Sequence, residues 1–488
     1  MAMLTLLLPL LVPLLAAVAV LAARRPGAAA RVAGTAGVLE LAAIAHAVIR
    51  IHLAGVLQAG PYLRADGLSA FFLVSIGLVF AFALAYSIGY LRHIPAGRFS
   101  SPRWFYALAF LFLFTMLAVY LSANLGLLWI FMEATTLASA LLVGFYNTEG
   151  AVEAGWKYLM VCTVGIAFAL FGTIVLYLAA VRSGVAGPQA LDWAVLQAAA
   201  VRLRPAADLV KLAFVFAAVG YGTKVGFAPM HHWLPDAHAE APSPISALLS
   251  AGLLNCALYA LLRFNAIVGG ALGPDFSHRI LLGFGVLSLL LAALLIVVQR
   301  DLKRLLAYSS IEHMGVAAIG VGVGTPLALF GALLHLFNHS LAKSLLFFAA
   351  GNIRERYGNA SLDEVRGLAQ ALPGTSVGLV AGGLAIAGLP PFGLFLSEFI
   401  ILSALFATGH YVVAVVVLAS FSVVFAALLH HVQPLLAGVA PAPERSFRTW
   451  WPGLAVMGVC GLCLLVLGVH LPAAFSRLLN AAVAVLRP

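Results

Sequence analysis

The sequence predicts an all-α, polytopic membrane protein. Of its 488 residues, 63% are hydrophobic and only 9% are charged, whereas about a quarter of the residues in an average soluble domain are charged. The mean hydropathy is +1.07. A water-soluble core could not hide this much apolar surface, so lipid must be the solvent for most of the chain. No segment is long and polar enough for a soluble domain, and residues 1–488 are expected to form a single integral-membrane domain.

Apolar runs long enough to cross a bilayer recur along the whole chain. A spanning helix needs about 20 mostly apolar residues, and about fourteen runs meet that condition. They lie at 3–22, 33–55, 66–91, 104–122, 124–146, 156–181, 209–228, 242–263, 279–298, 303–323, 325–350, 374–404, 409–432 and 451–471. The first run has no charged segment before it and no convincing cleavage site, so we expect it to be retained as a helix. The longer connections, 182–208 and 351–373, have room for an amphipathic or surface helix.

Positive charges favour one orientation of these spans. The odd-numbered connections hold 15 Lys and Arg, and the even-numbered connections with the C-terminus hold 9. Lys and Arg are enriched in cytoplasmic loops, so the bias predicts cytoplasmic odd connections and both termini outside. The same pattern accounts for the formal net charge of +10 without nucleic-acid binding.

Two of the predicted spans are interrupted. GTKVGFAPMHHWLP places Pro229 just after Lys224 in span 7, and AIAGLPPFGLFLSEF places Pro390 and Pro391 ahead of Glu398 in span 12. Proline removes a backbone donor and clashes with the preceding turn, so each helix should unwind there. Unwound backbone at membrane depth must be buried in protein or face a water-filled cavity.

Interruptions in both halves of the chain indicate inverted repeats. The N-terminal helices occupy 1–122. Spans 4 to 8 would form one five-helix repeat over 104–263, and spans 9 to 13 a second repeat over 279–432. The segment 451–488 would add a C-terminal helix.

Ionisable side chains inside apolar runs indicate function, because each costs about 2.5–3.5 kcal/mol at the bilayer centre. The first two are Glu133 in span 5 and Lys224 in span 7. Thr136 lies one turn after Glu133 and could donate a hydrogen bond to it. If the side chains of Glu133 and Lys224 meet, their separation would control their affinity for protons. A protonated structural glutamate and a lysine that snorkels to the surface are the alternatives.

A second group lies in span 11, HLFNHSLAKSLLFF. His335, His339 and Lys343 are four residues apart, which places them on one helix face, one turn apart. Histidine titrates near neutrality and can pass a proton between its ring nitrogens, so the group predicts a proton relay that ends at Glu398. A metal site is disfavoured because no HExxH glutamate is present and the lysine would repel a cation. Polar side chains that only hold helices together are the alternative.

Further candidates follow the first break and lie in span 10. His231, Asp236 and His238 in MHHWLPDAHAEAPSP predict a site of proton uptake, with loop structure or a metal cluster as alternatives. His313 lies beside Glu312 in span 10. The sequence contains no Walker loop, GxGxxG turn or Ser/His/Asp set. We therefore expect no nucleotide, cofactor or metal on this chain.

Several of these motifs resemble the antiporter-like membrane subunits shared by respiratory complex I, Mrp-type cation/proton antiporters and membrane-bound group 4 hydrogenases. The matching stretches are WIFMEATTLASALLVGFY, GYGTKVGFAPMHHWLPDAHAEAPSPISALLS, QRDLKRLLAYSSIEHMG, NHSLAKSLLFFAAG and GLPPFGLFLSEFIILSA. Together they cover spans 4 to 13. EATTLASALLVGFY, SSIEHMG and LLSAGLLNCALYALLR look most like the F-type subunit of hydrogenase-4 and formate hydrogenlyase complexes.

The resemblance implies a fourteen-helix fold with two inverted five-helix repeats, each carrying a half-channel. Matched by motif, the proton-transfer positions of the family are taken by Glu133, Lys224, His335, His339, Lys343 and Glu398. Several relatives have a lysine in span 8 where this chain has Asn255. Because asparagine does not titrate, the link between the half-channels would need water, His313 or another route.

The resemblance also implies a function. The chain would be a proton-translocating subunit, or one that exchanges Na+ for protons, in a redox-driven complex such as a group 4 hydrogenase or a formate-linked complex. It would be non-catalytic and lie in the cytoplasmic membrane of a bacterium or archaeon. Its partners would be other antiporter-like subunits and a peripheral redox arm that carries iron–sulfur clusters and, in a hydrogenase, NiFe. A stand-alone cation/proton antiporter component and a non-pumping membrane scaffold are the alternatives.

Overall fold

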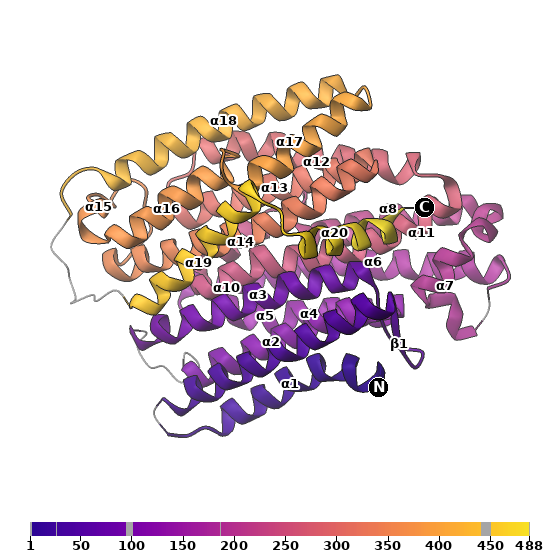
Figure 1. The fold of residues 1–488 in the computed structure, drawn as a ribbon, viewed down its shortest axis with the longest axis horizontal. Helices are drawn as coiled ribbons and strands as arrows, with labels where there is room; N and C mark the ends of the chain where they lie inside the picture. The colour runs from indigo at the N-terminus through magenta and orange to yellow at the C-terminus, as the bar shows by residue number, and fades with distance from the viewer. Residues whose placement is uncertain (1, 26, 94–100, 186, 441–449, 488) are drawn as a thin grey trace.

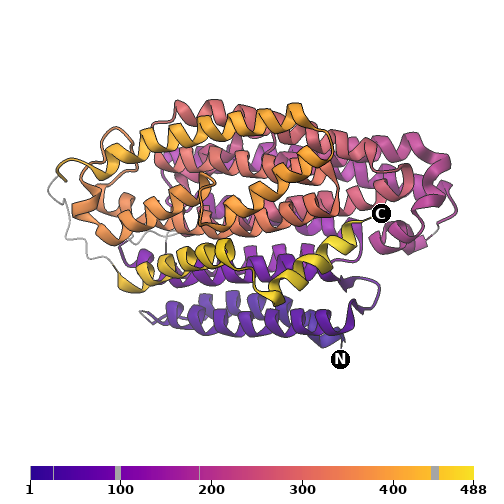
Figure 2. The same cartoon turned by 45° about the horizontal axis from the view of Figure 1, so that its top comes forward.

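The computed structural model describes residues 2–25, 27–93, 101–185, 187–440 and 450–487, and most of them are helical (Figure 1). The helices run roughly side by side in one elongated bundle, as two views show (Figures 1 and 2). Among the described residues, eleven helices are long and apolar enough to cross a membrane. The prediction of an all-α, polytopic membrane protein is confirmed. The described strands are β1 (Leu57–Ala59) and β2 (Leu63–Ala65), which form an antiparallel hairpin.

The helices follow the predicted order of spans. The long ones are α1 (Ala2–Ala22), α2 (Ala28–Ala54), α3 (Gly67–Tyr90), α4 (Pro102–Leu121), α5 (Leu125–Val143), α6 (Glu149–Arg182), α8 (Ala207–Val225), α11 (Leu254–Leu272), α12 (Asp275–Val297), α13 (Leu302–Val323), α14 (Pro326–Tyr357), α18 (Tyr411–Leu436) and α19 (Trp451–Val469). The shorter ones are α7 (Trp193–Ala198), α9 (Trp233–Glu240), α10 (Ser243–Leu248), α15 (Leu368–Ala371), α16 (Pro373–Ile386), α17 (Gly393–Ala407) and α20 (Ala473–Leu486). The 3-10 turns are η1 (Leu91–His93), η2 (Gly187–Leu191) and η3 (Ala200–Ala206), and η4 (Leu249–Leu253) is a π-helical turn.

Side-chain caps define where several helices begin. The side chains of Asp66, Asn124, Asp192 and Asp301 accept hydrogen bonds from backbone N–H groups in the first turns of α3, α5, α7 and α13. The first N–H groups of a helix have no hydrogen-bond partner within the helix. The capping side chain therefore supplies an acceptor oxygen that water would otherwise provide. The side chain of Thr325 caps the start of α14 in the same way.

Both predicted interruptions are present. α8 ends at Val225, Gly226 adopts a left-handed conformation (φ 85°), and α9 resumes the helix at Trp233. α16 ends at Ile386 and α17 begins at Gly393. The two breaks therefore fall at the glycine and proline residues that predicted them.

Protein groups satisfy the unwound backbone of the first break. The Phe227 N–H donates to the carbonyl of Gly222 (2.9 Å), and the Ala228 N–H donates to Ser288 Oγ (2.9 Å). These bonds replace the helical ones lost at the break, which is the condition for irregular backbone in the membrane.

A third interruption was not predicted. The expected last span, 451–471, ends as a helix at Val469, and α20 continues in the same general direction along the bundle (Figure 2). Gly468 lies so close to the backbone of Pro391 and Phe392 that a β-carbon there would clash with it. The second and third breaks are therefore neighbours.

The ends of the chain lie at one end of the bundle. The start of α1 and the end of α20 are at the same end as the β1–β2 hairpin and α7, whereas α15 lies at the opposite end (Figure 1). This arrangement agrees with two termini on one side of the membrane. Arg98, Arg445 and Arg448, which contribute to the predicted charge bias, lie outside the described residues.

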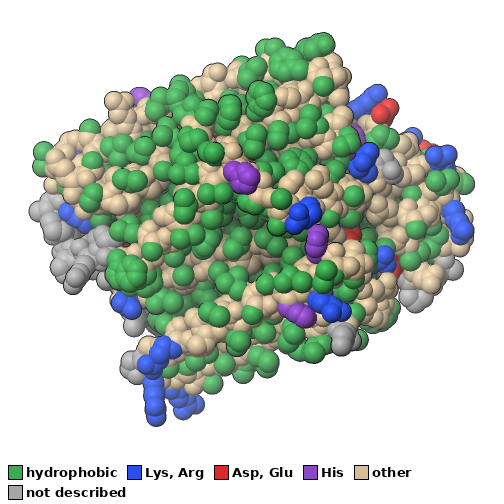
Figure 3. Space-filling model, in the orientation of Figure 1, with side chains coloured by type: hydrophobic (Ala, Val, Ile, Leu, Met, Phe, Trp, Pro, Cys, Tyr) green, Lys and Arg blue, Asp and Glu red, His purple; other side chains and the backbone are tan. Residues whose placement is uncertain are grey.

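Burial separates central helices from lipid-facing ones. The most apolar window of Ser243–Leu272 is 100% buried and that of α13 is 94% buried, but that of α18 is only 33% buried. Most of the surface on the face in Figure 3 is hydrophobic, and the Lys and Arg side chains lie mostly towards its two ends. α11, α13 and α14 therefore form the centre, with outer helices between them and the lipid.

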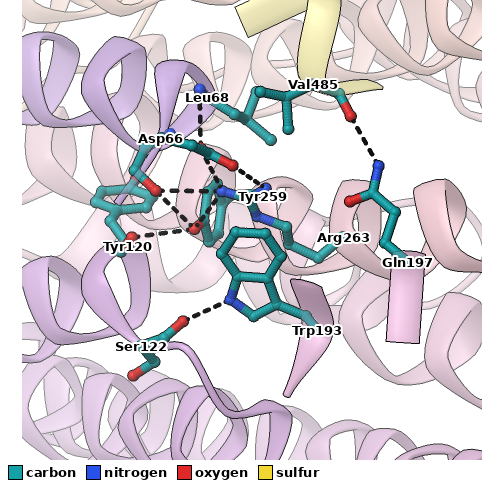
Figure 4. A network of polar contacts seen from close by, with 10 residues as sticks. Asp66, Leu68, Tyr120, Ser122, Trp193, Gln197, Tyr259, Arg263 and Val485 are labelled. Atoms are coloured by element: carbon teal, nitrogen blue, oxygen red, sulfur yellow. Dashed lines mark hydrogen bonds and ion pairs between the residues drawn. The ribbon is translucent and has the colours of Figure 1, made fainter. Parts of the chain in front are cut away.

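A buried ion pair joins α3 to α11 (Figure 4). The Arg263 guanidinium donates two 2.7 Å hydrogen bonds to the Asp66 carboxylate. It also lies over the Trp193 ring, 3.8 Å from the centroid. Trp193 Nε1 in turn donates to the carbonyl of Ser122 (2.8 Å). Because Asp66 also caps α3, this pair fixes the positions of α3, α7 and α11 at one end of the bundle.

We predict that Asp66→Asn destabilises the protein by about 3–5 kcal/mol, because it leaves the buried Arg263 charge without its counter-ion. Asp208→Asn is the matched control, since its ion pair with Lys211 is largely exposed and should contribute less than about 1 kcal/mol. Thermal unfolding of the purified chain in detergent measures both. Equal stability of the two variants would contradict the prediction.

Candidate functional site

A hydroxyl group, rather than an ion pair, connects the side chains of the first predicted pair, Glu133 and Lys224. Lys224 Nζ is fully buried and donates to the carbonyl of Met132 (2.7 Å) and to Thr136 Oγ1. The Glu133 carboxylate accepts a hydrogen bond from Thr163 Oγ1 (2.8 Å) and a long one from Thr136 Oγ1 (3.5 Å). Thr136 therefore lies between the two charged groups.

The second predicted group is fully buried on α14 and gains a member from α13. His335, His339 and Lys343 are each 0% exposed. The ring of His313 on α13 lies between the two α14 histidines, with ring centroids 5.1 Å from His335 and 5.3 Å from His339. The Glu398 carboxylate on α17 lies 4.0 Å from His313 Nδ1. We call these five side chains the central row.

Hydrogen bonds assign the protons on two of these histidines. Ser397 Oγ donates to the carbonyl of Leu394 (2.8 Å) and lies 3.1 Å from His335 Nδ1. A serine hydroxyl has one hydrogen, so His335 Nδ1 carries the proton in the second contact. His335 Nε2 is then the acceptor for His313 Nδ1–H at 3.2 Å. His313 Nε2 is buried and has no hydrogen-bond partner among the described residues.

The lysine end of the central row has a carboxylate nearby. Lys343 Nζ donates to the carbonyl of Leu306 (2.9 Å), and the charge of Glu312 on α13 acts on it. Glu312 is 1% exposed. Carboxylates thus lie near both ends of the row, Glu312 near the lysine and Glu398 near the histidines.

Asn255 lies between the two groups. Its side-chain amide donates to the carbonyl of Ala251 (2.9 Å) and to Ser340 Oγ (2.9 Å), and Ser340 is adjacent to His339 in α14. The next residue, Cys256, is within electrostatic range of Lys224. The preceding residues form the π-helical turn η4, a feature often found at functional sites. Hydrogen-bonding side chains without charge therefore lie between the two groups.

The residues of the motif after the first break lie in different environments. Asp236 forms ion pairs with Lys157 (3.4 Å) and with Arg304. These residues line a cavity of about 210 Å³ at the surface, together with Glu153 and Glu240. The cavity is polar and open to solvent, so ions can reach Asp236.

The two histidines of this motif do not share that cavity. His231 is 8% exposed and lies in the unwound segment, and His238 is fully buried with its ring stacked on Phe347 at 5.0 Å. Lys303 Nζ donates to the carbonyls of Ala239 (3.1 Å) and Ala241 (2.5 Å), and so holds the end of α9. His231, Asp236 and His238 therefore do not form a metal cluster.

In the part of the chain that the structure describes, one set of side chains has ligand atoms close enough for a metal ion. The ligand atoms of His313, His335 and Glu398 lie within 4.8 Å of one another. The His313–His335 hydrogen bond already uses two of these atoms, and Lys343 adds a positive charge to the same row. This geometry suits proton transfer better than cation binding.

Several side chains predicted from the sequence lie together in the structure, and some neutral neighbours were not predicted. Ser397 and Thr163 are ordinary helix residues in the sequence, and no spacing rule marks them. Ser340 is marked by the sequence, because it is adjacent to His339 on a helix already rich in polar side chains. The central position of His313 depends on how α13 packs against α14, which no local pattern reveals.

Known proteins resemble this chain in both sequence and fold. The family model described as NADH:quinone oxidoreductase/Mrp antiporter, TM, matches residues 122–425. The chain belongs to this family. A hydrogenase-4 component F homolog from Methylacidiphilum infernorum is 41% identical over 377 residues, covering 77% of this chain and 79% of that protein. NADH-quinone oxidoreductase subunit N from Desulforudis audaxviator is 34% identical over 442 residues, covering 87% and 85%.

Chains from solved structures of three membrane complexes share the fold over nearly the whole chain. A chain of the archaeal membrane-bound sulfane sulfur reductase superimposes with a TM-score of 0.87 at 23% identity, covering 99% of this chain and 97% of that one. A chain of the Mrp complex from Dietzia sp. gives 0.84 at 20% identity, with the same coverage. A chain of respiratory complex I from Thermus thermophilus gives 0.80 at 25% identity, covering 100% and 99%. The predicted resemblance is confirmed.

We predict that Asn255→Leu costs about 1–3 kcal/mol, because it removes the donor to buried Ser340. Asn480→Leu, an exposed position on α20, is the matched control and should change stability by less than about 0.5 kcal/mol. Thermal unfolding of both variants measures the difference. The effects of Asn255→Leu and Ser340→Ala should be non-additive; strictly additive effects would contradict the contact.

Proposed function

We propose that this chain is a proton-translocating subunit of a redox-driven membrane complex. The observation that carries the proposal is the central row, in which Lys343, His339, His313, His335 and Glu398 lie side by side in the buried centre of the bundle. Polar groups placed there at such cost are expected to move charge. The hydrogenase-4 and NADH-quinone oxidoreductase relatives support the redox-driven setting.

His313 gives the row a direction for the proton. Its Nε2 atom accepts a proton that arrives from Lys343 through His339. Its Nδ1–H then leaves towards Glu398, which lies 4.0 Å away. Imidazole gains and loses the proton on different nitrogens, so the ring passes it onward without turning. His335 is a positioning residue, because its Nε2 atom holds the Nδ1–H of His313 until Glu398 moves closer.

Electrostatic coupling connects the steps. Two unit charges about 4 Å apart interact by about 4 kcal/mol at an effective dielectric constant near 20. A proton on His313 therefore favours proton release from Lys343 and stabilises the ionised form of Glu398.

In the first half, movement of Lys224 between Thr136 and the carboxylate of Glu133 would change the charge near Cys256. Asn255 and Ser340 would pass this change to the row through oriented hydrogen bonds.

Proton uptake is proposed at the surface cavity around Asp236. Glu240 and Glu153 add negative charge to this cavity, which raises the local concentration of cations. His238 lies two residues after Asp236, and the charges of Lys303 and Lys343 both act on its ring. We propose that His238 links the cavity to the lysine end of the central row.

Other subunits would supply the energy. We propose that the chain lies in the cytoplasmic membrane of a bacterium or archaeon with both termini outside. Its partners would be further antiporter-like subunits and a peripheral redox arm with iron–sulfur clusters, together with NiFe if the complex is a hydrogenase. The partly exposed Glu133 is placed to respond to a neighbouring membrane subunit.

Lys343→Met should lower redox-driven proton movement by at least about tenfold, because the row loses its proton donor. Lys211→Met on α8 is the matched control, since that side chain is 48% exposed and should leave proton movement unchanged. Inverted membrane vesicles with the assembled complex and a pH-sensitive dye provide the measurement. Unchanged proton movement in Lys343→Met would favour a non-pumping scaffold, and strict dependence on Na+ would favour a cation/proton antiporter component.

Asp236→Asn should slow proton movement several-fold while stability changes by less than about 1 kcal/mol, because its partners are half exposed and such pairs contribute little to stability. Asp363→Asn, an exposed acid away from the uptake cavity, is the control. Stopped-flow recording of proton uptake, together with thermal unfolding, separates the two effects. Normal uptake in Asp236→Asn would exclude this cavity as the site of access.

A further inference from the structure

A second cavity lies on the outer side of the bundle, away from the central row. It has a volume of about 480 Å³ and is formed by the end of α12, the connection between α14 and α15, and the end of α18. Its lining side chains include Arg300, Arg366, Asp363, His430 and His431. We call it the α12–α18 cavity. α18 ends at the end of the bundle where α15 is found (Figure 1).

The charged side chains that line the α12–α18 cavity are more positive than negative. Asp363 lines it, but the described structure contains no ion pair between Asp363 and either Arg300 or Arg366. Two arginines and one aspartate leave a net charge of +1 with both histidines neutral. An anion with a single negative charge would balance it.

Hydrogen bonds hold the walls of the cavity in place. His431 Nε2 donates to the carbonyls of Ile296 (3.2 Å) and Val297 (3.1 Å) at the end of α12. Arg366 Nη1 donates to the carbonyls of Leu362 (2.9 Å) and Val365 (2.7 Å). The Nε and Nη2 hydrogens of Arg366 have no partner among the described residues, so they are available to a ligand.

The cavity lies at the edge of a lipid-facing surface. Leu294 is 69% exposed on α12, Val298 is 67% exposed just after it, and Leu429 is 46% exposed on α18. The apolar outer face of these two helices ends where the arginines and histidines begin. An apolar surface beside basic groups matches the structure of a phospholipid, in which the acyl chains adjoin the phosphate.

We propose that the α12–α18 cavity binds the phosphodiester headgroup of an anionic phospholipid. Arg300 and Arg366 hold the phosphate oxygens, since guanidinium groups match phosphate geometry. The acyl chains lie along the exposed side chains of Leu294 and Val298. Because a water molecule takes up about 30 Å³, the cavity has room for the headgroup and several waters. This binding would anchor the end of α18 to α12, and it does not depend on proton translocation.

Binding is measured on the full-length chain in nanodiscs of phosphatidylcholine, with phosphatidylglycerol added as the probe and retained lipid counted by native mass spectrometry. We expect Arg300→Gln to weaken phosphatidylglycerol binding roughly fivefold and the Arg300→Gln/Arg366→Gln double variant roughly 25-fold. The matched control is Arg25→Gln/Arg202→Gln, which removes the same charge from two exposed positions elsewhere and should bind as the unaltered chain does.

Three outcomes would overturn the proposal. The first is equal retention of phosphatidylglycerol by the double variant and the unaltered chain. The second is equal loss in the control variant, which would show a general effect of net charge. The third is displacement of the lipid by inorganic phosphate at similar concentration, which would assign the cavity to free phosphate. Arg300 makes no side-chain hydrogen bond or ion pair within the described chain, so its single variant remains informative if the double variant fails to fold.

Discussion

Polar groups in hydrocarbon must be enclosed by protein, and the rest of this structure depends on that constraint. The ionisable residues of α13 and α14 cannot face lipid, so these helices occupy the centre and others surround them. The unwound segments at Gly226 and Pro391 obey the same rule, because their backbone groups need partners that lipid cannot provide. Burial of α11, α13 and α14 is therefore a consequence of the side chains that they carry.

The two halves of the chain use different chemistry for related tasks. In the second half, His313 and His339 on adjacent helices bring titratable groups into direct contact. In the first half, Thr136 separates Glu133 from Lys224, and Asn255 donates to Ser340 Oγ. A hydroxyl or an amide can orient a hydrogen bond but does not hold a proton at neutral pH. Under the proposed function, the first half would serve control and the second half transport.

Some features of the fold were predictable and others were not. The two broken helices follow from local chemistry, since Pro229 and Pro390 disturb the helix wherever they lie. The third break before α20 was missed, because Pro472 lies just past the expected end of the last span at residue 471. The β1–β2 hairpin was not predicted, because it is only a few residues long and lies between two strongly apolar helices. Whether Glu133 and Lys224 meet could not be decided from the sequence, because the distance between two helices depends on packing. In the structure both side chains contact Thr136.

The sequence by itself determined that the chain spans a membrane, where two of its helices break and which side chains are costly to bury. These properties depend on composition and on neighbours within one or two helical turns. Only the tertiary structure decided that His313 joins the α14 histidines, that Asp66 pairs with Arg263 across almost two hundred residues, and that arginines from two connections meet beside α18. Those contacts arise from packing between helices, whose angle and register depend on all the surrounding side chains together.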